Sequence, residues 1–234
     1  MTVGRVVIPE PLPDGFALFY TTTDSDGALT PELMEIVRDR FGIEATLATC
    51  NLVHGMDVRR VGAGFSRPED HGRLKPAATQ PCDALYTSER GVALGIKVAD
   101  CLPVSLCDPV HRVIANIHSG WRGAVQNVTA ETLDALARAT AFDAHRAYAY
   151  LGPSIRVCCF EVGEEVAARF DERWIDRARG SKPHVDLARM TEAILRRRSV
   201  GRVIDTGFCT RCNPLFHSYR REKRTGRNLA IVAQ

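Results

Sequence analysis

A cysteine and a histidine lie at the ends of two short apolar runs and could carry chemistry together. Cys101 precedes the run Leu102–Leu106, and His118 ends the run Val113–Ile117, with the turn-forming pair Asp108-Pro109 between the runs. Short apolar runs bounded by turn residues are typical of buried strands. If the two strands pair as neighbours, the cysteine and the histidine come to one end of the sheet. A thiolate and an imidazole placed there could bind a soft metal ion, or act as nucleophile and base.

A second histidine, His54, also follows a strand-like run, Ala45–Thr49. One cysteine and two histidines match the ligands of a catalytic zinc site, in which the fourth position stays open for water or substrate. Zinc in such a site activates water near neutral pH. Asp100, next to Cys101, could orient a ligand or equally bond the backbone at the strand end. A lone histidine beside Val53 is also compatible with simple packing.

The remaining cysteines carry weaker signals. The chain has eight cysteines, and without a visible export signal we expect them to be reduced thiols. Cys209 and Cys212 have CxxC spacing, but a second pair with metal-ligand spacing is missing. The adjacent pair Cys158-Cys159 is unsuited to ligating one metal ion and is interpreted as strand packing. We therefore treat both pairs as structural.

A basic cluster near the C-terminus is the strongest charged feature of the chain. It consists of Arg220, Arg221, Lys223, Arg224 and Arg227. Such a run is usually a solvated face, but beside a metal pocket its guanidinium groups could bind phosphate. Arg220, Arg221 and Arg227 are the candidate phosphate ligands. The chain as a whole has 31 basic and 28 acidic residues, so its net charge does not favour nucleic acid.

The periodicity of the chain predicts strands and helices in irregular alternation. The expected strands are 16–22, 45–49, 58–61, 83–87, 91–98, 102–106, 113–117, 147–151, 200–205 and 228–232, and the expected helices are 30–41, 125–136, 161–170 and 186–198. Adjacent strands often lack a helix between them, which favours an α+β fold of mixed β-sheets flanked by helices over a doubly wound parallel sheet. Residues 62–81 are predicted to form a surface loop. We expect one domain over residues 1–234, with no membrane span and a cytoplasmic location.

Several segments together resemble the bacterial laccase-domain family, first described as polyphenol oxidases and later as zinc-dependent purine nucleoside enzymes. The resembling segments are LVHG, VADCLPVSLCDP, ANIHSGWRG, LGPSI, CFEVG and SYRREKRTGR. The resemblance implies a sandwich of mixed sheets and a metal site formed by His54, Cys101 and His118. It also implies phosphorolysis of purine nucleosides such as adenosine, inosine and guanosine, with possible deamination of adenosine. The chain departs from the family pattern at Leu52 and Thr23, where glutamine and arginine are usual, so we expect an altered pocket rim.

The expected partners are a purine nucleoside and phosphate, and the expected cofactor is Zn²⁺ rather than copper. A four-copper oxidase needs many imidazoles, whereas this chain has seven histidines and no His-x-His pair. Two competing functions stay open: a cysteine hydrolase that uses Cys101 and His118, and a non-catalytic zinc-binding partner protein. We expect a monomer or a small homo-oligomer, without binding to nucleic acid or membranes.

Overall fold

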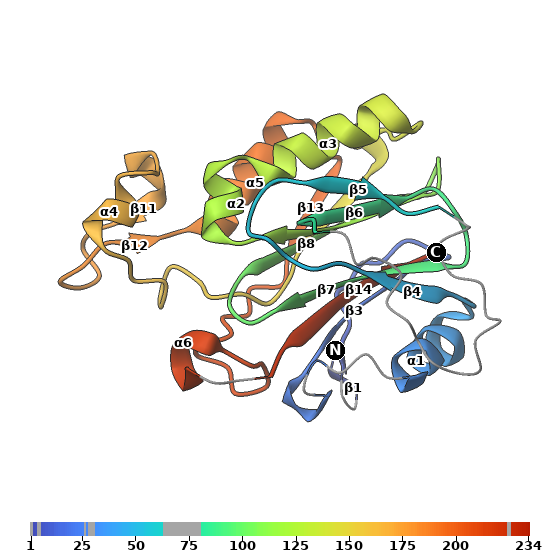
Figure 1. Cartoon of the computed structure of the whole chain (residues 1–234), viewed down its shortest axis with the longest axis horizontal. Coiled ribbons are helices and arrows are strands. Elements are labelled where there is room, and N and C mark those ends of the chain that lie inside the picture. Colours follow the sequence, from blue (N-terminus) through green and yellow to red (C-terminus); the bar gives the residue numbers. More distant parts are fainter. Residues whose placement is uncertain (1, 4–5, 26, 28–30, 63–80, 224–225) are drawn as a thin grey trace.

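Two six-stranded sheets stack on one another in the computed structural model, which describes residues 2–3, 6–25, 27, 31–62, 81–223 and 226–234 (Figure 1). The first sheet has the order β1 (Thr2–Val3), β2 (Val6–Val7), β3 (Ala17–Thr21), β14 (Asn228–Ala233), β7 (Val92–Val98), β4 (Thr46–Thr49). The second has the order β13 (Arg202–Asp205), β10 (Tyr148–Leu151), β8 (Leu102–Asp108), β9 (Val113–Ser119), β6 (Ala84–Thr87), β5 (Val58–Arg60). Both sheets contain parallel and antiparallel pairs, which confirms the predicted mixed sheets.

Helices cover the outer faces of both sheets. On the first sheet, α1 (Pro31–Phe41) packs Leu33 and Val37 against residues of β4 and β14. On the second, α3 (Val128–Ala139) and α5 (Leu187–Arg197) lie side by side, as Figure 1 shows above β5 and β6. Between the sheets lies a continuous apolar layer that includes Leu18, Leu94 and Ile114. The predicted sandwich flanked by helices is therefore confirmed.

The remaining elements are short. They are α2 (Trp121–Val125), α4 (Glu164–Ala167), α6 (Tyr219–Glu222), the 3₁₀ helices Thr23–Ser25, Ala144–Arg146 and Glu172–Trp174, and the hairpin of β11 (Ile175–Asp176) and β12 (His184–Val185). In Figure 1, α4 and this hairpin lie at one end of the sandwich.

The structure corrects some predicted boundaries. The helix expected over 161–170 is wrong in extent, because Glu161 pairs with His184 and Gly163 is extended, so α4 begins only at Glu164. The helix expected over 125–136 is divided into α2 and α3 at Asn127, whose φ is 63°. Most of the loop expected over 62–81 lies outside the described residues, as does Thr30, the first residue of the helix expected over 30–41.

The central pair β8 and β9 forms the most deeply buried part of the second sheet. Every residue of both strands is buried, and the register pairs Leu102 with Ser119 and Asp108 with Val113. Closely packed interiors move little, so the residues just beyond this pair are carried by a rigid support. This pair positions the site described next.

Candidate metal centre

The register of β8 and β9 brings Cys101 and His118 to one end of the sheet, as the sequence predicts. Because Leu102 lies opposite Ser119, Cys101 and Gly120 follow as the next residues along the two strands. A Cβ added to Gly120 would lie 3.1 Å from the Cys101 sulfur and 3.5 Å from Nε2 of His118. The missing side chain of Gly120 therefore leaves the space in which these two groups face each other.

His54 enters the same place from the segment between β4 and β5. Its backbone has a φ of 60°, in the left-handed region that non-glycine residues rarely adopt. Asp83 holds this turn: its carboxylate accepts hydrogen bonds from the backbone N–H of His54 (2.9 Å) and of Gly55 (2.7 Å). On the other side, a Cβ added to Gly123 of α2 would lie 2.9 Å from the Gly55 carbonyl oxygen. Glycine at position 123 therefore lets α2 approach the turn closely.

The side chains of His54, Cys101 and His118, called here the His–Cys–His site, can all reach one ion. Their candidate ligand atoms lie within 4.8 Å of one another. The two imidazole rings meet edge to face, with centroids 4.8 Å apart. His54 is exposed, Cys101 half-buried and His118 only 2% exposed, so the cluster opens to solvent on the His54 side. Three ligands with an open side suit a metal ion that must also bind substrate.

Asp83 also orients the buried histidine. Its carboxylate is 2.8 Å from Nδ1 of His118 and is fully buried. Burial raises the pKa of Asp83, but the bonds from His118, Gly55 and His54 outweigh burial and hold this pKa below its usual value. An ionised Asp83 keeps the proton of His118 on Nδ1, which leaves Nε2 free to face Cys101. A carboxylate on the distal nitrogen is the usual support of a metal-bound histidine.

Cys101 and His118 shift each other's pKa in opposite directions. Burial raises the pKa of Cys101, but hydrogen bonds from His118 and His54 outweigh it and lower the pKa to about 7. Burial lowers the pKa of His118, but Asp83 and Cys101 outweigh it and raise the pKa to about 9. A low-pKa thiolate is both a good metal ligand and a good nucleophile, so these pKa values are compatible with either chemistry.

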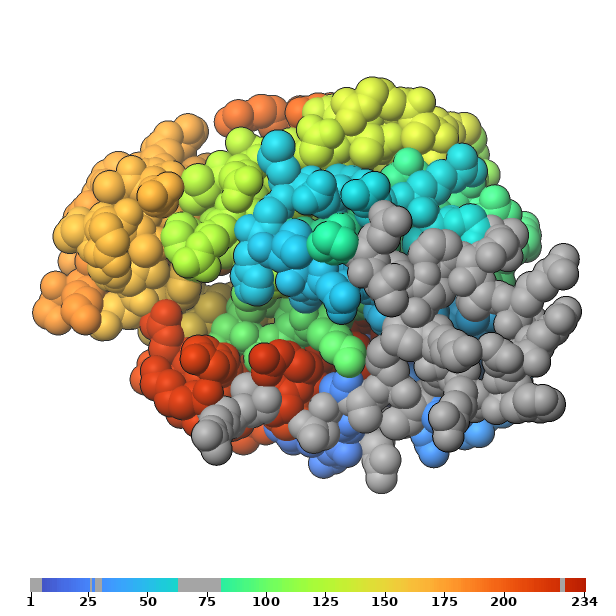
Figure 2. Space-filling model, viewed as in Figure 1, coloured from blue at the N-terminus to red at the C-terminus, as the bar shows by residue number. Residues whose placement is uncertain are grey.

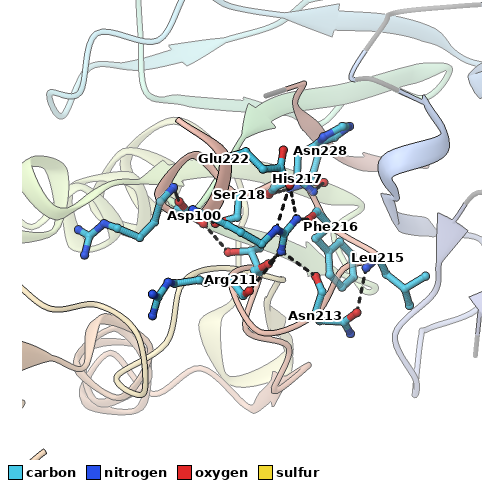
Figure 3. A network of polar contacts seen from close by, with 12 residues as sticks. Asp100, Arg211, Asn213, Leu215, Phe216, His217, Ser218, Glu222 and Asn228 are labelled. Atoms are coloured by element: carbon cyan, nitrogen blue, oxygen red, sulfur yellow. Dashed lines mark hydrogen bonds and ion pairs between the residues drawn. The ribbon is translucent and has the colours of Figure 1, made fainter. Parts of the chain in front are cut away.

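Asp100 holds the surrounding loops rather than a ligand side chain. Its φ is 87°, and its carboxylate accepts bonds from the Thr210 hydroxyl (2.6 Å) and from the backbone N–H of Arg220 (2.6 Å). Its backbone carbonyl accepts from the N–H of Ile155 (2.9 Å). Figure 3 shows these polar contacts, with Asp100 near Ser218. Of the two roles that the sequence allows for Asp100, the contacts match the structural one.

Of the three candidate phosphate ligands, Arg221 is committed to the backbone. Its guanidinium donates to the carbonyl oxygens of Thr210 (2.7 Å) and Phe216 (2.7 Å) and also bonds Glu222. Figure 3 shows Phe216, Glu222 and Asn213 around this network. These partners use the donors of the Arg221 guanidinium within the chain, and phosphate binding by Arg221 stays a prediction.

The other two arginines are placed differently. Arg220 is half-buried, its Nη1 donates to the carbonyl of Glu161 (2.8 Å), and its guanidinium lies 5.7 Å from the ring of Phe160. Arg227 is exposed and donates to the carbonyl of Gly226 (3.0 Å). The bond between the Arg220 backbone and Asp100 places the beginning of α6 next to the residue that precedes Cys101.

The residues of the site come from distant parts of the sequence that share one face of the molecule. In Figure 2 the cyan segment of residues 50–60 lies next to green residues near position 100, and the red segment around α6 lies on their other side.

None of the helices in the described part of the chain is long and apolar enough to cross a membrane.

Four other cysteines form a second group, called here the four-cysteine cluster: Cys158, Cys159, Cys209 and Cys212. Their sulfur atoms also lie within 4.8 Å of one another. The interpretation of Cys158-Cys159 as strand packing is wrong, because residues 157–159 form a turn. This turn supplies the second pair of thiols that the CxxC pair lacks in the sequence.

Comparison with known proteins identifies a family. Residues 11–234 match the family model described as multi-copper polyphenol oxidoreductase laccase. A purine nucleoside phosphorylase of Streptomyces coelicolor is 35% identical over 214 residues, which cover 89% of this chain and 84% of the relative. An adenosine deaminase of an unknown prokaryotic organism is 33% identical over 155 residues, which cover 62% of this chain and 59% of the relative.

Solved structures share the fold. The crystal structure of a Neisseria meningitidis protein superposes with a TM-score of 0.78 and 27% identity, covering 98% of this chain and 99% of that one. The protein YlmD of Geobacillus stearothermophilus superposes with a TM-score of 0.80 at 22% identity, covering 94% and 92% of the two chains. The second likeness concerns the fold alone.

Proposed function

The chain belongs to the multi-copper polyphenol oxidoreductase laccase family, and we propose that it is a metal-dependent purine nucleoside phosphorylase with its metal at the His–Cys–His site. The observation that carries the proposal is that three candidate ligand side chains converge on a position open to solvent. The 35% identity with a purine nucleoside phosphorylase over most of both lengths supports it.

The donor set fits a zinc ion. One thiolate and two imidazoles are the ligand types of catalytic zinc, and Asp83 holds His118 in the tautomer whose Nε2 can coordinate. The same donors can also bind a single copper ion. A multi-copper centre needs more imidazoles than the described residues gather, because their only histidine-containing metal cluster is the His–Cys–His site. We therefore propose Zn²⁺ over copper.

In phosphorolysis an oxygen of phosphate forms a bond to C1′ of the ribose, the C1′–N9 bond breaks, and the electron pair leaves with the base. A divalent ion bound at the site would supply positive charge for negative charge that develops in this step. Arg220 is our first candidate for binding phosphate, because Asp100 fixes the beginning of α6 beside Cys101. Arg227 is the second, since its exposed side chain lies at the start of β14.

The test is a nucleoside assay with and without phosphate. Zinc-loaded protein is incubated with inosine, guanosine or adenosine, and free base is measured by chromatography. We expect free base that depends on phosphate and that is lost in His118→Ala. Absence of turnover with all three nucleosides, at full zinc loading, would instead favour a non-catalytic binding protein.

Two other activities have specific support. The relative named adenosine deaminase favours conversion of adenosine to inosine, which needs no phosphate and is read in the same assay. The low pKa of Cys101 beside His118 favours a cysteine hydrolase. A metal-free protein that stays active as a hydrolase and loses this activity in Cys101→Ser would exclude the metal-dependent mechanism.

A further inference from the structure

The four-cysteine cluster joins two turns that are far apart in the sequence. Cys158 and Cys159 lie in the turn of residues 157–159, and Cys209 and Cys212 lie in the segment between β13 and α6. The Cys212 sulfur is 3.3 Å from the Cys159 sulfur and 3.9 Å from the Cys158 sulfur. We propose that these four thiolates bind one Zn²⁺ ion in a structural site separate from the His–Cys–His site.

The spacing of the sulfur atoms suits one ion at their centre. A Zn–S distance of about 2.3 Å in a tetrahedral site separates the sulfur atoms by about 3.8 Å. The distances of 3.3 and 3.9 Å lie on either side of this value, and no pair exceeds 4.8 Å. A disulfide requires about 2.05 Å, and all four cysteines are free thiols. Four thiolates complete the coordination of zinc, as in sites that support a fold rather than catalyse a reaction.

Backbone hydrogen bonds hold the two turns in place. The N–H of Cys159 donates to the carbonyl of Arg156 (2.8 Å), which closes the first turn, and the N–H of Asn213 donates to the carbonyl of Cys209 (2.9 Å), which closes the second. The two segments also pair directly, because Thr210 N–H donates to the carbonyl of Ser154 (3.0 Å). Cys159 and Cys209 are buried, whereas Cys158 and Cys212 are exposed and leave a route for the ion.

A positive charge lies beside the cluster. The Cys159 thiol lies close enough to the guanidinium of Arg211 to raise the pKa of this arginine. Four thiolates around one Zn²⁺ carry a net charge of two negative units, which a neighbouring guanidinium stabilises. Arg211 therefore complements the metal-bound state of the cluster.

The proposed ion would fix the loops around the other site. It would crosslink Cys159 to Cys212, 53 residues apart, and a link across a loop of this length restricts the unfolded chain. Between the two CxxC residues, Thr210 bonds both Asp100 and Arg221. The four-cysteine cluster is thus tied through Thr210 to the residue that precedes Cys101, although it contributes no ligand to the His–Cys–His site.

The test counts zinc in the full-length protein by mass spectrometry of the elements. His54→Ala/Cys101→Ser removes two of the three proposed ligands of the His–Cys–His site, so that the remaining zinc reports on the four-cysteine cluster. We expect two zinc ions per chain in the wild type and one in this double variant. Cys209→Ser/Cys212→Ser is expected to retain one zinc, and the control Cys50→Ser, at a half-buried cysteine outside both groups, is expected to retain two.

X-ray absorption at the zinc edge keeps the proposal testable if Cys209→Ser/Cys212→Ser fails to fold. In His54→Ala/Cys101→Ser we expect four sulfur neighbours at about 2.3 Å. A zinc-free double variant, a first shell of nitrogen or oxygen, or a disulfide among the four cysteines of freshly purified protein would overturn the proposal. None of these measurements depends on turnover of a nucleoside.

Discussion

Asp83→Asn tests how the buried carboxylate supports the proposed metal centre. Asp83 accepts three hydrogen bonds: from His118 Nδ1 (2.8 Å), His54 N–H (2.9 Å) and Gly55 N–H (2.7 Å). An amide has one acceptor oxygen and one NH₂ group. If the oxygen accepts from His118, the NH₂ group faces the N–H of Gly55, and two donors oppose each other. The substitution therefore disturbs either the histidine or the His54 turn.

The expected cost follows from these contacts. Loss of the partner behind a metal-bound histidine weakens metal affinity about 10–100-fold, or about 1.4–2.7 kcal/mol. Loss of one hydrogen bond to a charged acceptor lowers the free energy of unfolding of the metal-free protein by about 1.5–3 kcal/mol. Zinc affinity is measured by competition with a chelator and stability by urea unfolding. In the chelator competition, the zinc-binding step that the wild type shows and His54→Ala/Cys101→Ser lacks is assigned to the His–Cys–His site.

Asp108→Asn is the matched control. Asp108 is also fully buried, at the other end of β8, and it accepts from the ring of His111 (2.9 Å) and from the N–H groups of Val110 and Asp143. We expect this variant to lose comparable stability without a change in zinc affinity. Unchanged affinity in Asp83→Asn, or an equal loss in Asp108→Asn, would refute the role given to Asp83.

Three further predictions concern the same region. Gly120→Ala places a Cβ 3.1 Å from the Cys101 sulfur, so zinc affinity is expected to fall about tenfold in the chelator competition, and unchanged affinity would contradict the tight approach. Because the pKa of Cys101 is about 7 and that of His118 about 9, zinc binding at pH 8 is expected to displace about one proton, from His118, and more protons below pH 7. The number of protons released is measured by calorimetry in buffers of different ionisation enthalpy. A proton release that does not rise on acidification would contradict these pKa values. Arg221→Ala is expected to lower the free energy of unfolding in urea by about 1.5–3 kcal/mol, because two buried carbonyls lose a charged donor. Arg220→Ala is expected to raise the KM for phosphate in steady-state kinetics. If Arg220→Ala lowered stability and Arg221→Ala raised the KM, the two roles would be exchanged.

Local sequence patterns predict the elements of this fold well where strands are fully buried. β8 and β9 follow from two apolar runs around Asp108-Pro109, and their pairing correctly predicts that Cys101 meets His118. A helix is predicted less well where tertiary pairing competes, as at Glu161, whose backbone joins His184 instead of extending α4. Short runs such as β11 and β12 carry too few residues for a periodicity to be read.

The site itself depends on contacts that sequence spacing does not encode. Asp83 reads as the first residue of a buried strand, and only the fold shows that it bonds both His118 and the His54 turn. A carboxylate in front of an apolar run is the one available signal, since buried charges require partners. The four-cysteine cluster is a similar case, because its two pairs meet through loops that are distant in the chain, with Cys159 and Cys212 separated by 53 positions.

Phosphorus NMR of inosine and phosphate with the zinc-loaded protein tests the proposed activity most directly. We expect a new sugar-phosphate signal that grows in proportion to the hypoxanthine formed, and neither product in His54→Ala/Cys101→Ser. Hypoxanthine without a new phosphorus signal would show hydrolysis instead of phosphorolysis. An equal yield of sugar phosphate from the double variant would contradict a role for the His–Cys–His site in the reaction.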